Sequence, residues 1–140
     1  MKWAPVLVTA IFFVTGSTSV GAASEFVAAN KQRVVPASIE GAQMEVFSTA
    51  GAAGPQYFCA AGDYAVRRLE AGNSDRLVVV KGEAPSESRP RFRSVFFSVV
   101  PWQGERGGNS SINVQVDRPG EEMSVVVARK FCPPRFKRRF

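Results

Sequence analysis

The sequence predicts a single α+β domain in which one helix packs on a mostly antiparallel sheet of about four or five strands, held by one disulfide. Three observations support this prediction. Residues 55–71 place apolar side chains at helical spacing, and segments with apolar residues at every second position follow them. The chain has 140 residues, of which 45% are hydrophobic, and this length and composition suit one core. Two cysteines allow one bridge.

Residues 1–23 are typical of a signal peptide that export removes. Lys2 supplies the positive start, residues 3–14 are mostly apolar, and Gly21 and Ala23 are small residues at positions −3 and −1 of a cleavage site. The alternative is a membrane anchor, but a spanning helix needs roughly 20 apolar residues and polar residues interrupt this run. We therefore expect a periplasmic or secreted protein with no transmembrane span after processing.

Cys59 and Cys132 are predicted to form a disulfide, because oxidising compartments join cysteine pairs. The bridge would close a loop of 74 residues, for which chain entropy predicts roughly 4.5 kcal/mol of stabilisation. The alternative is a reactive thiolate, which usually needs a His as its base, and the chain contains no His. The same absence argues against Ser-His-Asp catalysis and against most zinc sites, so we expect no metal and no cofactor.

Residues 24–42 have no sustained period and predict an extended N-terminal arm that Phe26, Val34 and Val35 dock onto the domain. The α+β domain itself is predicted to cover residues 43–132. It begins with a short strand near residues 44–48 and a flexible Gly- and Ala-rich loop.

The helix predicted over residues 55–71 has start and stop signals. Pro55 suits the first turn, and Gly72 with Asn73 suits a left-handed C-terminal cap. Gly62 lowers helix propensity by roughly 1 kcal/mol relative to Ala, so we expect it to mark close packing of the backbone. Asp63 is expected to be a solvated helix residue rather than a catalytic acid.

After the helix, the apolar period changes to two. Strands are predicted over residues 76–82 and 92–101, and a hairpin is predicted from strands 110–117 and 121–129, joined by a type II turn with Pro119 and Gly120 at its centre. This hairpin would return Cys132 to the helix, so that the disulfide staples the final strand.

Basic residues are concentrated at the C-terminus. From residue 24 onwards the chain has 17 Lys and Arg against 12 Asp and Glu, and residues 129–140 hold six of the bases and no acid. The remaining 11 basic and 12 acidic residues nearly balance, which indicates that basicity belongs to the terminus rather than to the whole fold surface.

Residues 133–140 are predicted to project as a basic aromatic tail, because Pro133 and Pro134 prevent a further paired strand. Alternating cations and aromatic rings bind phosphate-bearing surfaces such as anionic lipid, lipopolysaccharide or another polyanion. The alternative is a solubilising tail without a partner. The candidate contact residues are Arg135, Phe136, Lys137, Arg138, Arg139 and Phe140.

Trp102 is a candidate ligand contact, because it lies in a Gly-rich loop after Pro101. The alternative is a Trp that covers one edge of the core.

The run YFCAAGDYA, with Tyr57, Phe58, Cys59, Gly62, Asp63 and Tyr64, resembles small exported proteins of unknown function from alphaproteobacteria. The resemblance covers roughly residues 43–132 and includes the late Cys132. It implies a periplasmic location and a disulfide, and it implies no activity. In size, export and single bridge the chain is also similar to periplasmic lysozyme inhibitors, although it has no matching inhibitory-loop motif.

These observations lead to three hypotheses. The first is a non-catalytic binding or envelope-associated module that acts through its cationic tail. The second is a periplasmic inhibitor of a secreted hydrolase such as lysozyme, acting through residues 83–91 or 102–109. The third is an enzyme, for which only carboxylates, Tyr57 and Tyr64 remain as acid-base groups.

Overall fold

The computed structural model describes residues 24–37, 42–104 and 114–134. These residues form one antiparallel sheet of six strands in the order β1-β2-β3-β5-β4-β6, together with two helices. The predicted α+β class is confirmed, with more strands than expected and a second, short helix. The elements are β1 (Phe26–Val27), β2 (Arg33–Pro36), β3 (Gln43–Phe47), α1 (Gly54–Leu69), β4 (Arg76–Pro85), β5 (Arg93–Val100), β6 (Glu122–Ser124) and α2 (Val125–Lys130).

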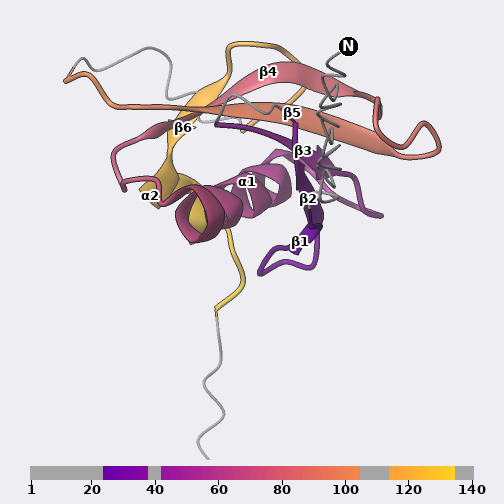
Figure 1. Ribbon diagram of the computed structural model, residues 1–140, viewed down its shortest axis with the longest axis horizontal. Coiled ribbons are helices and arrows are strands. Elements are labelled where there is room, and N and C mark those ends of the chain that lie inside the picture. The colour runs from indigo at the N-terminus through magenta and orange to yellow at the C-terminus, as the bar shows by residue number, and fades with distance from the viewer. Residues whose placement is uncertain (1–23, 38–41, 105–113, 135–140) are drawn as a thin grey trace, which may run out of the picture.

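Both helices lie on the same side of the long ribbon formed by β4 and β5, and the chain after α2 runs away from the sheet (Figure 1). Within the part of the chain that the structure describes, neither helix combines the length and apolar character needed to cross a membrane.

Helix α1 begins where its sequence signals predict and ends slightly earlier than expected. Pro55 lies in the first turn, and the Gln56 side-chain oxygen accepts a hydrogen bond from the backbone N–H of Ala53 at 3.0 Å. The left-handed cap falls on Glu70, with φ +54°, so the prediction of a cap at Gly72 is wrong. The backbone N–H of Gly72 instead donates to the carboxylate of Asp75 at 2.8 Å, which fixes the turn into β4.

The core lies between α1 and one face of the sheet. Side chains alternate along β3, so Met44 and Val46 face α1 and pair with Phe97 and Val95 of β5. The rings of Phe58 and Phe97 meet edge to face at 5.1 Å between centroids. This apolar layer fixes the orientation of α1 against the sheet.

The segment predicted as an N-terminal arm pairs with the sheet as β1 and β2, which the sequence did not predict. Val34 of β2 lies opposite Val46 of β3, and Phe26 of β1 lies opposite Val34. Phe26 and Val34 are buried, whereas Val35 is only partly buried. The arm therefore contributes to the core.

The predicted C-terminal hairpin is wrong. Residues 110–113 lie outside the described residues, and residues 114–117 belong to no strand. The segment 121–129 forms the short β6, which pairs with β4, and then α2. The turn before β6 is as expected, since Gly120 has φ +92°.

The chain turns from strand to helix after Ser124 because the loop after α1 supplies acceptors for the first backbone N–H groups of α2. The backbone N–H groups of Val125 and Val126 donate to the carbonyls of Asp75 (2.9 Å) and Asn73 (3.1 Å). These contacts, with the burial of Val125 and Ala128, outweigh the strand preference of three consecutive valines.

Candidate functional site

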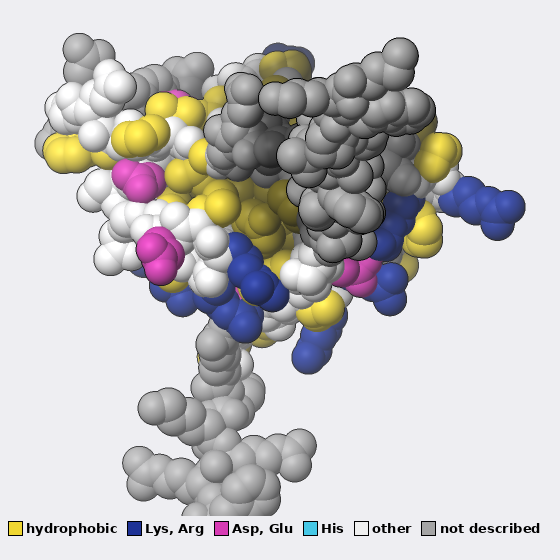
Figure 2. All heavy atoms as spheres, viewed as in Figure 1, with side chains coloured by type: hydrophobic (Ala, Val, Ile, Leu, Met, Phe, Trp, Pro, Cys, Tyr) yellow, Lys and Arg dark blue, Asp and Glu magenta, His cyan; other side chains and the backbone are white. Residues whose placement is uncertain are grey.

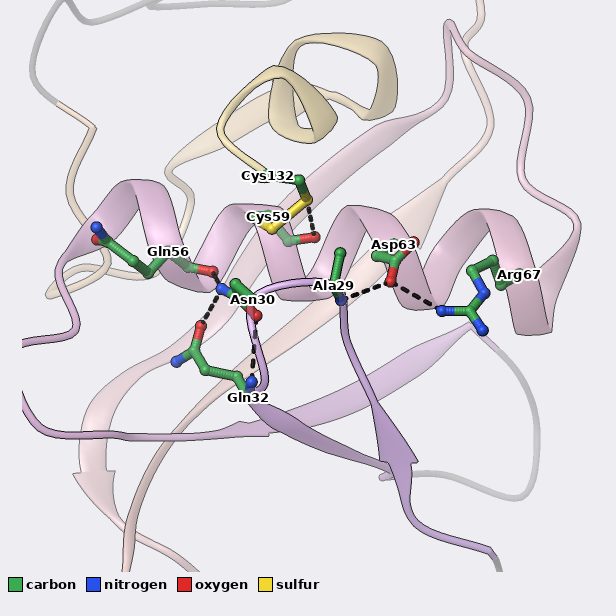
Figure 3. The surroundings of a disulfide bond; sticks show 8 residues. All are labelled: Ala29, Asn30, Gln32, Gln56, Cys59, Asp63, Arg67 and Cys132. Atoms are coloured by element: carbon green, nitrogen blue, oxygen red, sulfur yellow. Dashed lines mark hydrogen bonds and ion pairs between the residues drawn. A yellow bond between two sulfur atoms is a disulfide. The ribbon is translucent and has the colours of Figure 1, made fainter. Parts of the chain in front are cut away.

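Cys59 and Cys132 form the predicted disulfide, with Cα atoms 5.0 Å apart (Figure 3). Cys59 is buried in α1, and Cys132 lies two residues beyond α2. Both cysteines of the chain are joined, so neither is a thiolate nucleophile. The bridge staples the segment after α2 to α1, rather than a final strand to the helix.

Gly62 marks the close approach that the sequence predicted. A Cβ atom at this position would lie 3.2 Å from the Cβ of Ala128 and 3.2 Å from the Cγ of Arg129. Helices α1 and α2 therefore pack at close range beside the disulfide, which explains the glycine inside α1.

Asp63 is buried, so the expectation that it is a solvated residue is wrong. Its carboxylate accepts a hydrogen bond from the backbone N–H of Ala29 at 2.9 Å and pairs with Arg67 at 3.2 Å (Figure 3). Ala29 lies in the β1–β2 turn. Asp63 thus holds that turn against α1, a structural role that the helix pattern could not reveal.

Tyr57 and Tyr64, the two tyrosines considered for acid-base chemistry, are both buried. Burial raises the pKa of each hydroxyl above the ordinary value of 10.0. Neighbouring side chains act on the Tyr57 hydroxyl as well, since Ser48 lowers its pKa and Glu83 raises it. These positions suit packing against the core better than proton transfer at neutral pH.

Carboxylates and metal ligands are not gathered into a cleft within the described parts of the chain. No group of three His, Cys, Asp or Glu side chains there is placed to hold a metal ion. The two surface hollows described below have no carboxylate in their lining.

The first hollow, which we call the basic pocket, has a volume of about 260 Å³. It combines cations, hydroxyl groups and aromatic rings from three separate parts of the chain. Its lining residues are Lys31, Arg33, Phe47, Ser48, Thr49, Arg89 and Phe92.

Two guanidinium groups at the basic pocket converge on one carboxylate. Glu25 pairs with Arg89 at 2.7 Å and with Arg33 at 3.4 Å. Arg89 also lies over the ring of Phe47, 4.9 Å from its centroid. Lys31 is exposed and contacts no carboxylate within the described residues.

The loop that supplies Arg89 and Phe92 is fixed by a buried carboxylate, Glu45 of β3. Glu45 is 2% exposed and accepts hydrogen bonds from Ser86, from Ser88 at 2.5 Å and from Ser94 at 2.7 Å. The Ser86 hydroxyl in turn accepts a hydrogen bond from the backbone N–H of Arg89 at 2.9 Å. The three hydroxyl groups donate hydrogen bonds to the Glu45 carboxylate, and these bonds offset the free-energy cost of burying it.

The second hollow, which we call the tail-root surface, lies where the described chain ends. It is shallow and is lined by Val27, Ala28, Ala29, Lys31, Arg67, Pro133 and Pro134. Lys31 thus borders both hollows. Arg67 and Arg68 both lie over the ring of Phe26, at 4.8 and 5.5 Å, which places them next to each other beside this surface.

Lys and Arg side chains gather on the lower part of the body in Figure 2. The body has no net positive charge outside residues 129–140, yet the fold concentrates its cations at this end. Sequence counting missed this local patch because its members come from the β1–β2 turn, β2, α1 and the β4–β5 loop.

Trp102 is 54% exposed, so it does not cover a core edge. Its backbone N–H donates to Asp75 at 3.3 Å, and its side chain lines neither hollow. The tail candidates Arg135, Phe136, Lys137, Arg138, Arg139 and Phe140 lie outside the described residues, as does the predicted signal peptide.

No protein family, curated protein or solved structure matched this chain.

Proposed function

We propose that this protein is an exported, non-catalytic module that attaches to an anionic lipid surface of the cell envelope. One observation carries the proposal. Pro133 and Pro134, from which the basic tail continues, line the same surface as Lys31 and Arg67 of the body. The tail therefore begins beside cations of the fold, and in this proposal both sets of cations contact the same lipid surface.

The chemistry of the tail-root surface fits a membrane better than a single small ligand. It is shallow, it joins cations to apolar groups, and Val27 on it is 52% exposed. Each Lys or Arg near an anionic membrane contributes about 1 kcal/mol, and neighbouring apolar side chains add contact with the headgroup boundary. A disulfide and a predicted signal peptide support a periplasmic or secreted location.

Vesicle co-sedimentation tests this proposal. The protein, purified without reductant, is expected to bind vesicles containing phosphatidylglycerol and to leave neutral phosphatidylcholine vesicles unbound. Deleting residues 135–140 removes four cations and is expected to weaken binding by about 100-fold or more. Binding is also expected to fall as salt rises.

Charge reversal at single sites sharpens the test. Lys31→Glu is expected to weaken vesicle binding by about 10-fold or more, whereas Arg118→Glu, an equal charge change at an exposed turn beside β6, serves as the matched control. Equal binding by the full and truncated chains would reject the proposal. If the protein bound lipopolysaccharide or heparin more tightly than phosphatidylglycerol, that polyanion would replace the lipid as the proposed partner.

A second function, inhibition of a secreted hydrolase, is favoured by the rigidity of loop 86–92. The backbone N–H of Ser86 donates to the carbonyl of Phe92 (2.8 Å), and that of Phe92 donates to the carbonyl of Arg89 (2.9 Å). A loop held in this way loses little conformational entropy when it binds a partner. Stoichiometric inhibition of a lysozyme that Arg91→Ala weakens would support this function, and no inhibition across a lysozyme panel would remove it.

A further inference from the structure

The basic pocket has the composition of an anion site with an apolar wall. Lys31, Arg33 and Arg89 provide up to three positive charges, and Ser48 and Thr49, whose side chains are neutral hydroxyl donors, also line the hollow. Phe92, which is 49% exposed, presents an open ring on the same hollow.

Glu25 shows that the two guanidinium groups of this region can serve one oxyanion. It lies within ion-pair distance of both Arg33 and Arg89, and it is not itself part of the pocket lining. A carboxylate engages only these two cations. A phosphate monoester carries a charge of about −1.5 to −2 at pH 7 and three acceptor oxygens, so it can also use Lys31 and the hydroxyl groups.

The pocket is held in shape before any ligand arrives. The Glu45 carboxylate fixes Ser86 and Ser88, and Ser86 fixes the backbone of Arg89. Phe92 meets Phe47 edge to face at 6.1 Å between centroids. A site whose cation and ring are fixed in advance loses less entropy on binding than a mobile one.

We propose that the basic pocket is a binding site for a phosphate monoester whose organic group packs against Phe92. This inference goes beyond surface attachment, because a soluble ligand can fill the site without any membrane. The same chemistry occurs in a free phosphate ester and in a lipid headgroup such as that of phosphatidic acid, and the two experimental arms below separate these sources.

The first arm uses soluble probes and isothermal titration calorimetry. The protein purified without reductant is expected to bind phenyl phosphate with one-to-one stoichiometry. Inorganic phosphate is expected to bind about 5-fold more weakly, because it cannot cover the Phe92 ring. Phe92→Ala is expected to reduce phenyl phosphate binding to the level of inorganic phosphate.

Variants of the polar lining test the assignment of the anion. Lys31→Gln and Arg89→Gln are each expected to weaken phenyl phosphate binding by about 10-fold, since each removes a charge-assisted hydrogen bond. Thr49→Val removes a hydroxyl with little change of shape and is expected to weaken binding by about 3-fold to 5-fold. Thermal melts of each variant separate loss of binding from loss of folding.

Glu25→Gln is expected to act in the opposite direction. It releases Arg33 and Arg89 from their internal carboxylate, so phenyl phosphate is expected to bind about 5-fold more tightly. Glu121→Gln makes the same charge change beside β6 and is expected to leave the affinity unchanged. If both variants bound phenyl phosphate more tightly by the same factor, the cause would be a general charge effect, and this result would overturn the proposed site.

The second arm compares vesicles of phosphatidic acid, which has a monoester headgroup, with vesicles of phosphatidylglycerol, a diester. Tighter binding to phosphatidic acid that Arg89→Gln abolishes identifies the lipid as the source, and binding of soluble phenyl phosphate alone identifies a free ester. Deleting residues 135–140 is expected to weaken vesicle binding and to leave phenyl phosphate binding intact, so this proposal and the surface proposal fail separately. Absence of saturable binding in both arms overturns the site.

Discussion

Both faces of β3 carry buried side chains, but the chemistry that covers them differs. Met44 and Val46 face α1 within an apolar layer, whereas Glu45, between them, faces the opposite side and is covered by the loop that bears Ser86 and Ser88. The helix face therefore gains its stability from apolar area, whereas the other face combines the buried ring of Phe47 with hydrogen bonds to one carboxylate. The comparison teaches that burial in this fold does not imply an apolar environment.

The largest expected effect is a loss of stability, and it differs between two neighbouring residues of β5. Phe97→Ala empties a fully buried position against Phe58 and is expected to lower the free energy of unfolding by about 3–5 kcal/mol. Phe96→Ala, on the opposite face and only partly buried, is expected to cost about 1 kcal/mol. Urea unfolding of the two variants measures the difference, and equal losses would contradict the division between the faces.

The disulfide adds a covalent constraint to the helix face alone. Replacing both Cys59 and Cys132 by Ala is expected to lower the free energy of unfolding by about 4 kcal/mol, because the bridge closes most of the domain into one loop. Adding reductant to the unaltered protein serves as a second route to the same state. Unfolding at an unchanged urea concentration in both experiments would show that the bridge does not contribute to stability.

The hydrogen-bonded face is tested by Glu45→Gln, which keeps the shape of the side chain and removes its charge. We expect a loss of about 2 kcal/mol, because the serine hydroxyls lose a charged acceptor in a buried site. Glu87→Gln, in the same loop but highly exposed, is the control and is expected to change stability by less than about 0.5 kcal/mol. A comparable effect of both substitutions would show that burial of Glu45 adds nothing.

The smallest expected effect is a loss of stability at alkaline pH, and it arises from two tyrosines of α1 on the helix face. Burial raises the pKa of Tyr57 and Tyr64 in the folded state, so their contribution to stability is complete below pH 10 and is lost as pH rises beyond it. We therefore expect the free energy of unfolding to decrease as the pH rises from 10 towards 10.5. Tyr57→Phe is expected to reduce this slope in urea unfolding measured between pH 8.5 and 10.5, and an unchanged slope would assign it to other groups.

Periodicity was sufficient where local apolar spacing and tertiary packing favour the same element. Helix α1 and strands β3, β4 and β5 follow their apolar patterns closely. The pattern failed at residues 121–129, where alternating Met123, Val125 and Val127 indicate a strand. There the carbonyls of the loop after α1 and the small surface at Gly62 favour a helix, and both are contacts with residues far away in the sequence.

The candidate sites were less predictable than the fold. The helix pattern assigned Asp63 to solvent and the strand pattern gave Glu45 no role, because nothing near them in the sequence reveals the β1–β2 turn or the serines that cover them. The basic pocket likewise has no local motif, since its residues meet only after β2, β3 and the β4–β5 loop have paired. The disulfide was accessible to the sequence because two cysteines permit a single pairing, and the close approach beside it because Gly62 interrupts an otherwise regular helix pattern.

The position of Cys132 has a mechanical consequence. It lies one residue before Pro133, so a pulling force applied to the C-terminal segment passes through the sulfur–sulfur bond into the middle of α1. The short helix α2 therefore does not carry this force, and its contacts with α1 are not pulled apart. Under reducing conditions the same force would instead reach α2 directly, and the molecule would open from its C-terminal end.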